Sequence, residues 1–258
     1  MIRLALRVQR EQAEMVLAEL LELAPGGVEE LADGDVVEYA VYGAPGELPD
    51  LPDLRAAAGA ALVEVSTTEV ADDWDERWKA FHQPVRVGEL YVRPPWAPPR
   101  EGLRDVVIDP AQAFGTGAHP TTRLCLELLL ELQPGGALVD VGCGSGVLSI
   151  AAAKLGFAPV RAFDFDPQAV EATERNAADN GVSIEVGQAD LREDELPEAE
   201  LALANIAADA VVALGPRLRA ARAITSGYLV SDEPELEGYR RESRVESGGW
   251  AADLHVRE

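Results

Sequence analysis

Residues 137–155, ALVDVGCGSGVLSIAAAKL, decide the fold class of this chain. Residues 137–141 form a continuous apolar run that predicts a buried strand, and residues 147–155 have the spacing of a helix. The turn between them contains Gly142, Gly144 and Gly146. Such a turn lets the backbone approach a ligand closely and presents helix N-terminal amides to it, although tight packing alone would also require glycine. The stretch therefore predicts an α/β unit with a candidate ligand site at the end of this strand.

Strands and helices alternate from residue 104 onward, which predicts a domain over residues 101–258. A helix is expected to begin at Pro167 and to stop at Gly181. The expected further strands cover residues 161–165, 184–187, 201–206 and 224–231. Residues 243–256 contain Gly248-Gly249 between two alternating segments, which is typical of a hairpin. The pattern predicts a doubly wound α/β fold with a mostly parallel sheet and a terminal antiparallel hairpin.

Two further regions precede this domain. Residues 1–69 show a strand, helix, strand, strand, helix, strand order, with a turn at Asp33-Gly34, and predict a small α+β domain of the ferredoxin-like type. Residues 70–100 predict a linker with a short helix that carries Trp74, Trp78 and Phe81 on one face. These aromatic residues would anchor the linker to a domain, or else contact a substrate.

Charge and cysteine content limit the classes of function. The chain has 46 acidic and 22 basic side chains, for a net charge of -24, which disfavours direct nucleic-acid binding and favours a basic partner. Cys125 and Cys143 lack metal-ligand spacing, and with three histidines no metal site is expected. The N-terminal residues do not resemble a signal peptide, and no apolar run reaches 18 residues. We therefore expect a cytoplasmic protein that does not contact the membrane.

The spacing of the glycines narrows the class of ligand that the turn can bind. The turn reads G-x-G-x-G rather than the G-x-G-x-x-G of dinucleotide sites, and Asp164 ends the next predicted strand 22 residues after Gly142. A carboxylate at that place can accept hydrogen bonds from both hydroxyls of a ribose. An adenosyl ligand without a pyrophosphate therefore fits better than NAD.

Four motifs together resemble one family. They are AFGTGAHPTT at 113–122, DVGCGSGVLSIAA at 140–152, FDFDPQAVEATERNAADNG at 163–181 and LANI at 203–206. In series they resemble the PrmA family of S-adenosylmethionine-dependent methyltransferases, which act on ribosomal protein L11. The resemblance covers almost the whole chain. It implies a seven-stranded methyltransferase sheet, a substrate-recognition role for residues 1–69, and methyl transfer to lysine side chains and the N-terminal amine of L11, by a monomer.

The resemblance also implies a set of site residues. Cofactor contacts are implied at Thr122, Gly142, Asp164 and Asn205, with Gly144 in the same turn and Asp190 near the adenine. Phe114, Gly115 and Thr116 are expected to form a loop over the cofactor. Asn205 is the candidate catalytic residue, through a hydrogen bond to the substrate amine or by positioning the cofactor. His119 and Asp166 are expected to be structural, Asp166 as a helix N-cap.

Two alternatives to this function stay open. The chain could methylate another protein lysine or a small amine, or it could bind the cofactor without catalysis. The second alternative is disfavoured by the presence of Gly142, Asp164 and Asn205. The family pattern Ser-Gly-Ile-Leu after the fifth strand has no match at residues 229–234, LVSDEP. The end of this strand, which borders the substrate side of the sheet, is therefore where the chain departs from the family pattern.

Overall fold

A computed structural model describes residues 2–13, 16–17, 20, 28–43, 48–49, 51–69, 82–110 and 117–258 of the chain. It divides into two compact units, Met1–Ala80 and Phe81–Glu258. The predicted aromatic face of the linker, at Trp74, Trp78 and Phe81, lies outside the described residues, as does the predicted loop at Phe114, Gly115 and Thr116.

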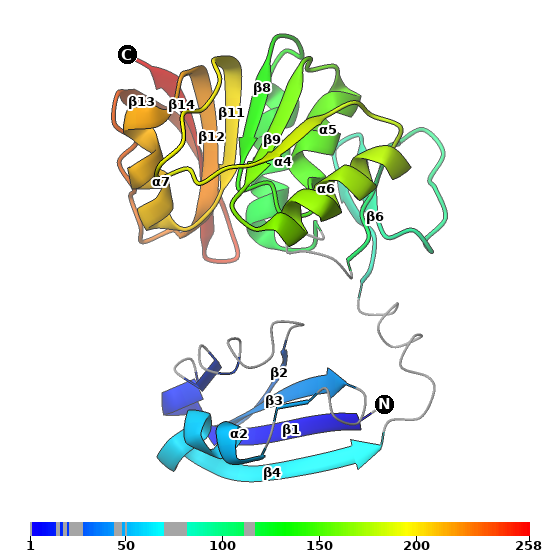
Figure 1. Cartoon of the computed structure of the whole chain (residues 1–258), viewed down its shortest axis with the longest axis vertical. Helices are drawn as coiled ribbons and strands as arrows, with labels where there is room; N and C mark the ends of the chain where they lie inside the picture. Colours follow the sequence, from blue (N-terminus) through cyan, green and yellow to red (C-terminus); the bar gives the residue numbers. More distant parts are fainter. Residues whose placement is uncertain are drawn as a thin grey trace. The chain divides into compact units, whose positions relative to one another are not determined.

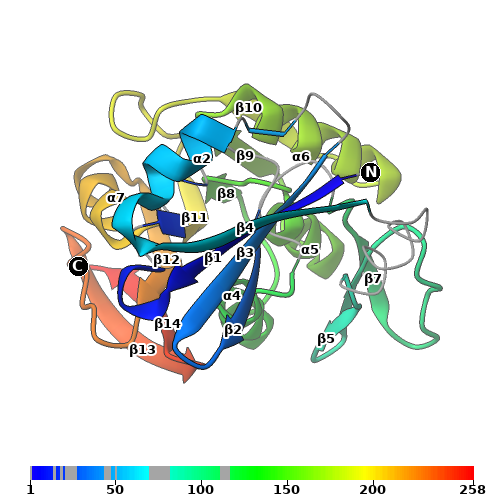
Figure 2. The same ribbon diagram turned by 90° about the horizontal axis from the view of Figure 1, so that it is seen from below.

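The N-terminal unit contains a four-stranded antiparallel sheet (Figure 2). Its strands are β1 (Ile2–Gln9), β2 (Glu29–Asp33), β3 (Val36–Gly43) and β4 (Leu62–Glu69), in the order β2-β3-β1-β4. Short 3-10 turns, η1 (Arg10–Gln12) and η2 (Gly59–Ala61), follow β1 and helix α2 (Leu51–Ala58). Alternating residues Leu4, Leu6 and Val8 pack with Leu54 of α2 in one buried cluster. These three residues point to the same side of the strand, so one face of β1 lies in the core of this unit.

A small three-stranded sheet begins the C-terminal unit. Its strands are β5 (Val85–Val87), β6 (Leu90–Arg93) and β7 (Arg104–Val107), in the order β5-β6-β7. The first two belong to the segment 70–100 for which the sequence predicted a linker. Leu90 and Val92 are almost fully buried and join the same hydrophobic cluster as α4 and α5. Residues 85–93 are therefore part of the packed C-terminal unit, which periodicity alone did not reveal because the strands are only three and four residues long.

The main sheet has seven strands in the order β10-β9-β8-β11-β12-β14-β13 (Figure 1). They are β8 (Leu138–Val141), β9 (Val160–Asp164), β10 (Glu185–Gln188), β11 (Ala199–Asn205), β12 (Ala220–Leu229), β13 (Tyr239–Ser247) and β14 (Trp250–Arg257). The first five in this order pair in parallel, whereas β14 is antiparallel to both of its neighbours. The predicted mostly parallel sheet with a terminal antiparallel hairpin is confirmed.

Helices cover both faces of this sheet (Figure 1). They are α4 (Pro120–Glu131), α5 (Val147–Leu155), α6 (Pro167–Asp179) and α7 (Ala208–Leu214), with the 3-10 turn η3 (Gly215–Arg217) after α7. Leu201 and Leu203 of β11 enter the core beneath α4 and α5, whereas Ala202 and Ala204 enter the core beneath α7. Both faces are buried, which explains why the strand reads as a continuous apolar run rather than an alternating one.

The strand order reverses between β8 and β11. The chain runs outward through β8, β9 and β10, then returns to place β11 on the other side of β8. In open α/β sheets the crevice at such a reversal, at the carboxyl ends of the strands, is where ligands bind. The turn that begins at Gly142, after β8, and the turn that follows Asn205, after β11, therefore flank the expected ligand crevice.

Candidate active site

The glycine-rich turn after β8 adopts a backbone shape that only glycine accepts readily. Gly142, Gly144 and Gly146 have φ of 74°, 55° and 78°. The amides of Gly142 and Cys143 both donate to the carbonyl oxygen of Phe163, at 2.8 and 3.1 Å, and so tie the turn to β9. Side chains at the three glycines would impose left-handed strain on the turn.

Asp164 links the end of β9 to the glycine turn. Its Oδ2 accepts a hydrogen bond from the Gly144 amide at 2.9 Å, and its Oδ1 accepts one from the Asp166 amide at 3.0 Å. The side chain is buried, with 8% of the residue exposed. Because each carboxylate oxygen has more than one lone pair, both can accept a further hydrogen bond from a ligand. The sequence-predicted ribose acceptor is thus held rigidly against the turn predicted to bind the same ligand.

Asn205 and Thr122 come together although they lie 83 residues apart in the chain. The side-chain Nδ2 of Asn205, at the end of β11, donates to Thr122 Oγ1 at 3.4 Å. Thr122 is the third residue of α4 and is fully buried. No described residue donates a hydrogen bond to Asn205 Oδ1. The side-chain carbonyl of Asn205 is therefore the atom left to meet a ligand or substrate donor.

Two glycines enclose the residue that follows Asn205. A Cβ atom at Gly142 would lie 2.5 Å from Ile206 Cγ2, and a Cβ atom at Gly227 would lie 2.2 Å from the Ile206 carbonyl oxygen. The Ile206 amide also donates to the Ser226 carbonyl at 2.9 Å. Gly142 thus has the packing role that the sequence left open beside ligand approach, because its missing side chain leaves room for Ile206, directly after Asn205.

Gly227 also corrects an expectation about the fifth parallel strand. The pattern Ser-Gly-Ile-Leu is expected after this strand. Its counterpart, Ser226-Gly227-Tyr228-Leu229, lies within β12 itself. The pairing of β12 with β14 shifts register between Ser226 and Tyr228, and Gly227 has φ of 104°. The left-handed glycine of the pattern thus forms a bulge inside the strand, whereas the sequence comparison places it in a turn after the strand.

His119 begins α4 and has the structural role that the sequence predicted. Its Nδ1 accepts a hydrogen bond from the Thr121 amide as the N-cap, and Pro120 follows at the first helical position. Burial lowers the pKa of His119, which favours the neutral ring that this cap requires. The ring also packs edge-on against Trp250 of the terminal hairpin, with centroids 4.7 Å apart. Both contacts hold the first turn of α4, and with it Thr122.

Asp166 and Asp190 both stabilise local structure. Asp166 accepts a hydrogen bond from the Gln168 amide at 2.9 Å and caps α6, as predicted. Asp190 Oδ1 accepts one from the Arg192 amide at 2.8 Å in an exposed turn. That turn stays beside the end of β9, because the Ala189 amide donates to the Asp164 carbonyl oxygen at 2.9 Å. One oxygen of Asp190 is thus engaged in the turn, and the cofactor role of Asp190 stays a prediction.

Two residues of this region were missed by sequence analysis. Phe165, directly after Asp164, is 71% exposed at the carboxyl end of β9. Asp140 interrupts the strand described as continuously apolar and is fully buried. Ser149 donates to Asp140 Oδ2 through both its amide, at 3.1 Å, and its hydroxyl, while Asp140 Oδ1 has no partner among the described residues. Two features of the sequence could have identified them, namely an aromatic residue directly after the predicted ribose carboxylate and a charged residue inside an apolar strand.

Burial has a large effect on Asp140. It raises the pKa of this carboxyl to about 7, against the opposing effect of the two Ser149 hydrogen bonds.

Among the described residues, no group of three or more His, Cys, Asp or Glu side chains could hold a metal ion. In the same part of the chain, no helix is long and apolar enough to cross a membrane.

Comparison with known proteins identifies close relatives. The family model described as ribosomal protein L11 methyltransferase (PrmA) matches residues 51–252. A protein named ribosomal protein L11 methyltransferase from Parasynechococcus marenigrum is 42% identical over 227 residues, covering 79% of this chain and 78% of that protein. One of the same name from Pelotomaculum thermopropionicum is 41% identical, with 77% and 70% covered. The crystal structure of a ribosomal protein L11 methylase from Lactobacillus delbrueckii subsp. bulgaricus is similar with a TM-score of 0.62 at 28% identity, covering 69% of this chain and 100% of that one.

Proposed function

The chain belongs to the ribosomal protein L11 methyltransferase family, and from this premise we propose that it methylates lysine side chains and the N-terminal amine of ribosomal protein L11. The family makes it a protein methyltransferase that uses S-adenosylmethionine as the methyl donor. The observation that carries the proposal is the contact between Asn205 and Thr122 at the strand reversal, beside the glycine turn and Asp164. Four segments far apart in the sequence supply these groups to one crevice.

The described residues fit an adenosyl ligand. Asp164 presents two fixed carboxylate oxygens for the ribose hydroxyls, and the exposed ring of Phe165 offers a surface on which the adenine can stack. Thr122 lies in the first turn of a twelve-residue helix, where a hydroxyl and the helix dipole favour the methionyl carboxylate. Gly144, whose amide donates to Asp164, and Asp190, which follows Ala189 beside the end of β9, are further candidate contacts. We assign these residues to cofactor binding on this chemistry.

In the mechanism, Asn205 aligns the amine that accepts the methyl group. Bound S-adenosylmethionine supplies an electrophilic methyl group for an in-line displacement by nitrogen. A free lysine amine has a pKa near ~10.4, so a site that removes it from water favours its neutral, nucleophilic form. Asn205 Oδ1 accepts a hydrogen bond from that amine and turns its lone pair toward the methyl carbon. Thr122 holds Asn205 in this orientation through the Nδ2 contact.

The N-terminal unit is proposed to recognise the target protein. Its strand order β2-β3-β1-β4, antiparallel throughout, supports the ferredoxin-like assignment, because that fold places the first and third strands at the centre. A chain that lacks residues 1–80 should keep its affinity for S-adenosylmethionine and lose most transfer to L11. Unchanged transfer by this truncated chain would contradict a recognition role.

The test of the function uses purified ribosomal protein L11 and labelled S-adenosylmethionine. We expect label on L11, and tandem mass spectrometry of the product should place it on lysine side chains and on the N-terminal amine. A free lysine and an unrelated basic protein serve as controls. Transfer to either control at the rate seen for L11 would favour the alternative of a less selective amine methyltransferase. Absence of transfer to every amine, with S-adenosylmethionine bound, would favour the non-catalytic alternative.

A further inference from the structure

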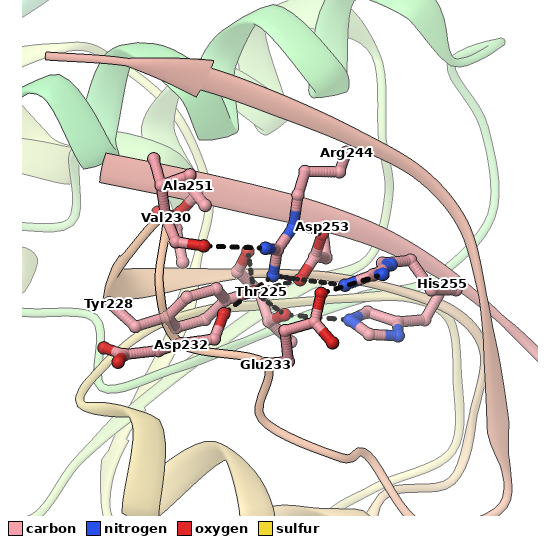
Figure 3. Close-up of polar contacts among 11 residues, drawn as sticks. Thr225, Tyr228, Val230, Asp232, Glu233, Arg244, Ala251, Asp253 and His255 are labelled. Carbon is pink, nitrogen blue, oxygen red and sulfur yellow. Dashed lines mark hydrogen bonds and ion pairs between the residues drawn. The ribbon is translucent and has the colours of Figure 1, made fainter. Parts of the chain in front are cut away.

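A buried polar network joins the last three strands of the main sheet (Figure 3). Asp253 of β14 is almost fully buried. Its Oδ1 accepts a hydrogen bond from Arg244 Nε at 2.7 Å, and its Oδ2 accepts one from Arg244 Nη2 at 2.8 Å. The Tyr228 hydroxyl donates to the same Oδ2 at 2.9 Å. Thr225 Oγ1 lies 2.8 Å from the Tyr228 hydroxyl and 3.0 Å from His255 Nε2. Asp253 thus holds the Arg244 guanidinium in one orientation.

The remaining donors of Arg244 reach a turn in the backbone. Nη2 donates to the Asp232 carbonyl oxygen at 3.0 Å, and Nη1 donates to the Val230 carbonyl oxygen at 3.3 Å (Figure 3). The turn also closes on itself, because the Leu229 amide donates to Asp232 Oδ2 at 3.1 Å and the Asp232 amide donates to the Leu229 carbonyl at 3.0 Å. Arg244 therefore connects the buried network to residues 229–232.

This turn follows the strand that pairs with the strand of Asn205. In the pairing of β11 with β12, Asn205 lies opposite Ser226, and β12 continues for three more residues to Leu229. Three residues span at most roughly 10 Å, and the bulge at Gly227 shortens that reach, so the turn begins within about 10 Å of Ser226, at the sheet edge where ligands bind. Leu229 is 47% exposed there. The turn, held by these hydrogen bonds, thus forms a wall at the strand end beside that of the proposed catalytic residue, and its Leu229 side chain is open to solvent.

We propose that Arg244 is a positioning residue, which holds residues 229–232 as the wall against which the target polypeptide docks beside Asn205. The proposal rests on the proposed function. An arginine suits this role because its planar guanidinium has five donors, so that it can bind both carboxylate oxygens and two carbonyls at once. A lysine can keep the ion pair with Asp253 but cannot supply that set of hydrogen bonds from one nitrogen.

The test compares Arg244→Lys with Arg222→Lys in the full chain. Arg222 lies near the other end of β12 and pairs with Glu242 of β13, so it controls for replacement of an ion-paired arginine by lysine in the same strands. Amide exchange of residues 229–232, the Kd for S-adenosylmethionine, and KM and kcat for L11 are measured. For Arg244→Lys we expect the rate of amide hydrogen exchange at residues 229–232 and the KM for L11 to rise by about tenfold or more. This is the scale expected when the hydrogen bonds that hold the turn are lost. The cofactor Kd and kcat should stay near wild type, and Arg222→Lys should change none of these.

Three results would overturn the proposal. The first is an unchanged rate of amide hydrogen exchange at residues 229–232 in Arg244→Lys. The second is an unchanged KM for L11, and the third is a loss of affinity for S-adenosylmethionine as large as the change in KM. If Arg244→Lys does not fold, the double variant Arg244→Met with Asp253→Asn removes both buried charges together, and the same readouts apply to it. If wild-type protein fails to methylate L11, the proposed function fails, and the exchange measurement still decides whether Arg244 holds the turn.

Discussion

Replacement of Gly227 by alanine is the sharpest perturbation of the candidate site that leaves its polar groups in place. Gly227 has φ of 104° and lies in the bulge of β12. A Cβ atom there would lie 2.2 Å from the Ile206 carbonyl oxygen, 2.6 Å from its carbonyl carbon and 2.9 Å from its amide nitrogen. All three atoms belong to the backbone directly after Asn205, so no flexible side chain can move aside.

The size of the effect follows from these distances. The contact at 2.2 Å is about 1.2 Å shorter than the 3.4 Å at which ordinary contact begins, so the two backbones must separate by roughly 1 Å. A displacement of that size in a group that aligns the reactants can lower the rate by about 10²-fold. The left-handed φ adds a cost of about 1–2 kcal/mol to folding for a residue with a side chain. We therefore expect a large loss of kcat together with a moderate loss of stability.

Gly238→Ala provides the matched control. Gly238 has φ of 80°, but a Cβ atom there would meet nothing within 4 Å, so this variant carries the backbone strain without the clash. Thermal unfolding, the Kd for S-adenosylmethionine and kcat for L11 are measured for both variants. We expect Gly238→Ala to keep its kcat and to lose about 1–2 kcal/mol of stability from backbone strain alone. Gly227→Ala should lose more stability than this control, because it adds the clash, and it alone should lose kcat. Wild-type kcat in a folded Gly227→Ala protein would refute the reasoning that the Asn205 turn depends on this contact.

Three further perturbations test other parts of the site. Asp164→Ala should weaken binding of S-adenosylmethionine by about 1–3 kcal/mol, since ribose hydroxyls would lose their acceptor; calorimetry showing an unchanged Kd would remove Asp164 from the site. Asn205→Ala should leave the melting temperature nearly unchanged and lower kcat by about 10²-fold, whereas early melting with wild-type turnover would make Asn205 a structural residue. The raised pKa of Asp140, about 7, means that the folded state binds a proton more readily than the unfolded state between about pH 4 and 7. Stability should therefore fall by roughly 3 kcal/mol as pH rises from about 5 to 8 without ligand, and urea unfolding of Asp140→Asn should lack this fall; parallel curves for the two proteins would contradict it.

The segments that could be read from the sequence are those whose signals are local. The glycine turn, the Pro167 helix with its Asp166 cap and the Gly248-Gly249 hairpin each depend on neighbouring residues, and all three occur in the structure. The parallel sheet was also predictable, because strands buried on both faces leave continuous apolar runs between helical segments. Asp164 could be anticipated from its distance to the glycine turn, and its hydrogen bond to the Gly144 amide agrees with that placement.

Only the tertiary structure decided which distant residues meet. The contact between Asn205 and Thr122 spans 83 residues, and the pairs Gly142 with Ile206 and Arg244 with Val230 each depend on how strands or their turns are aligned. Such pairings leave no local periodicity, because their energy comes from packing and hydrogen bonds across the sheet rather than along the chain. The two strands within residues 85–93 escaped prediction because runs of three and four residues show too little periodicity. The sequence alone therefore indicated an adenosyl ligand and determined the parallel sheet of the C-terminal unit, whereas the sheet register determined how Asn205 is held and which turn follows the neighbouring strand.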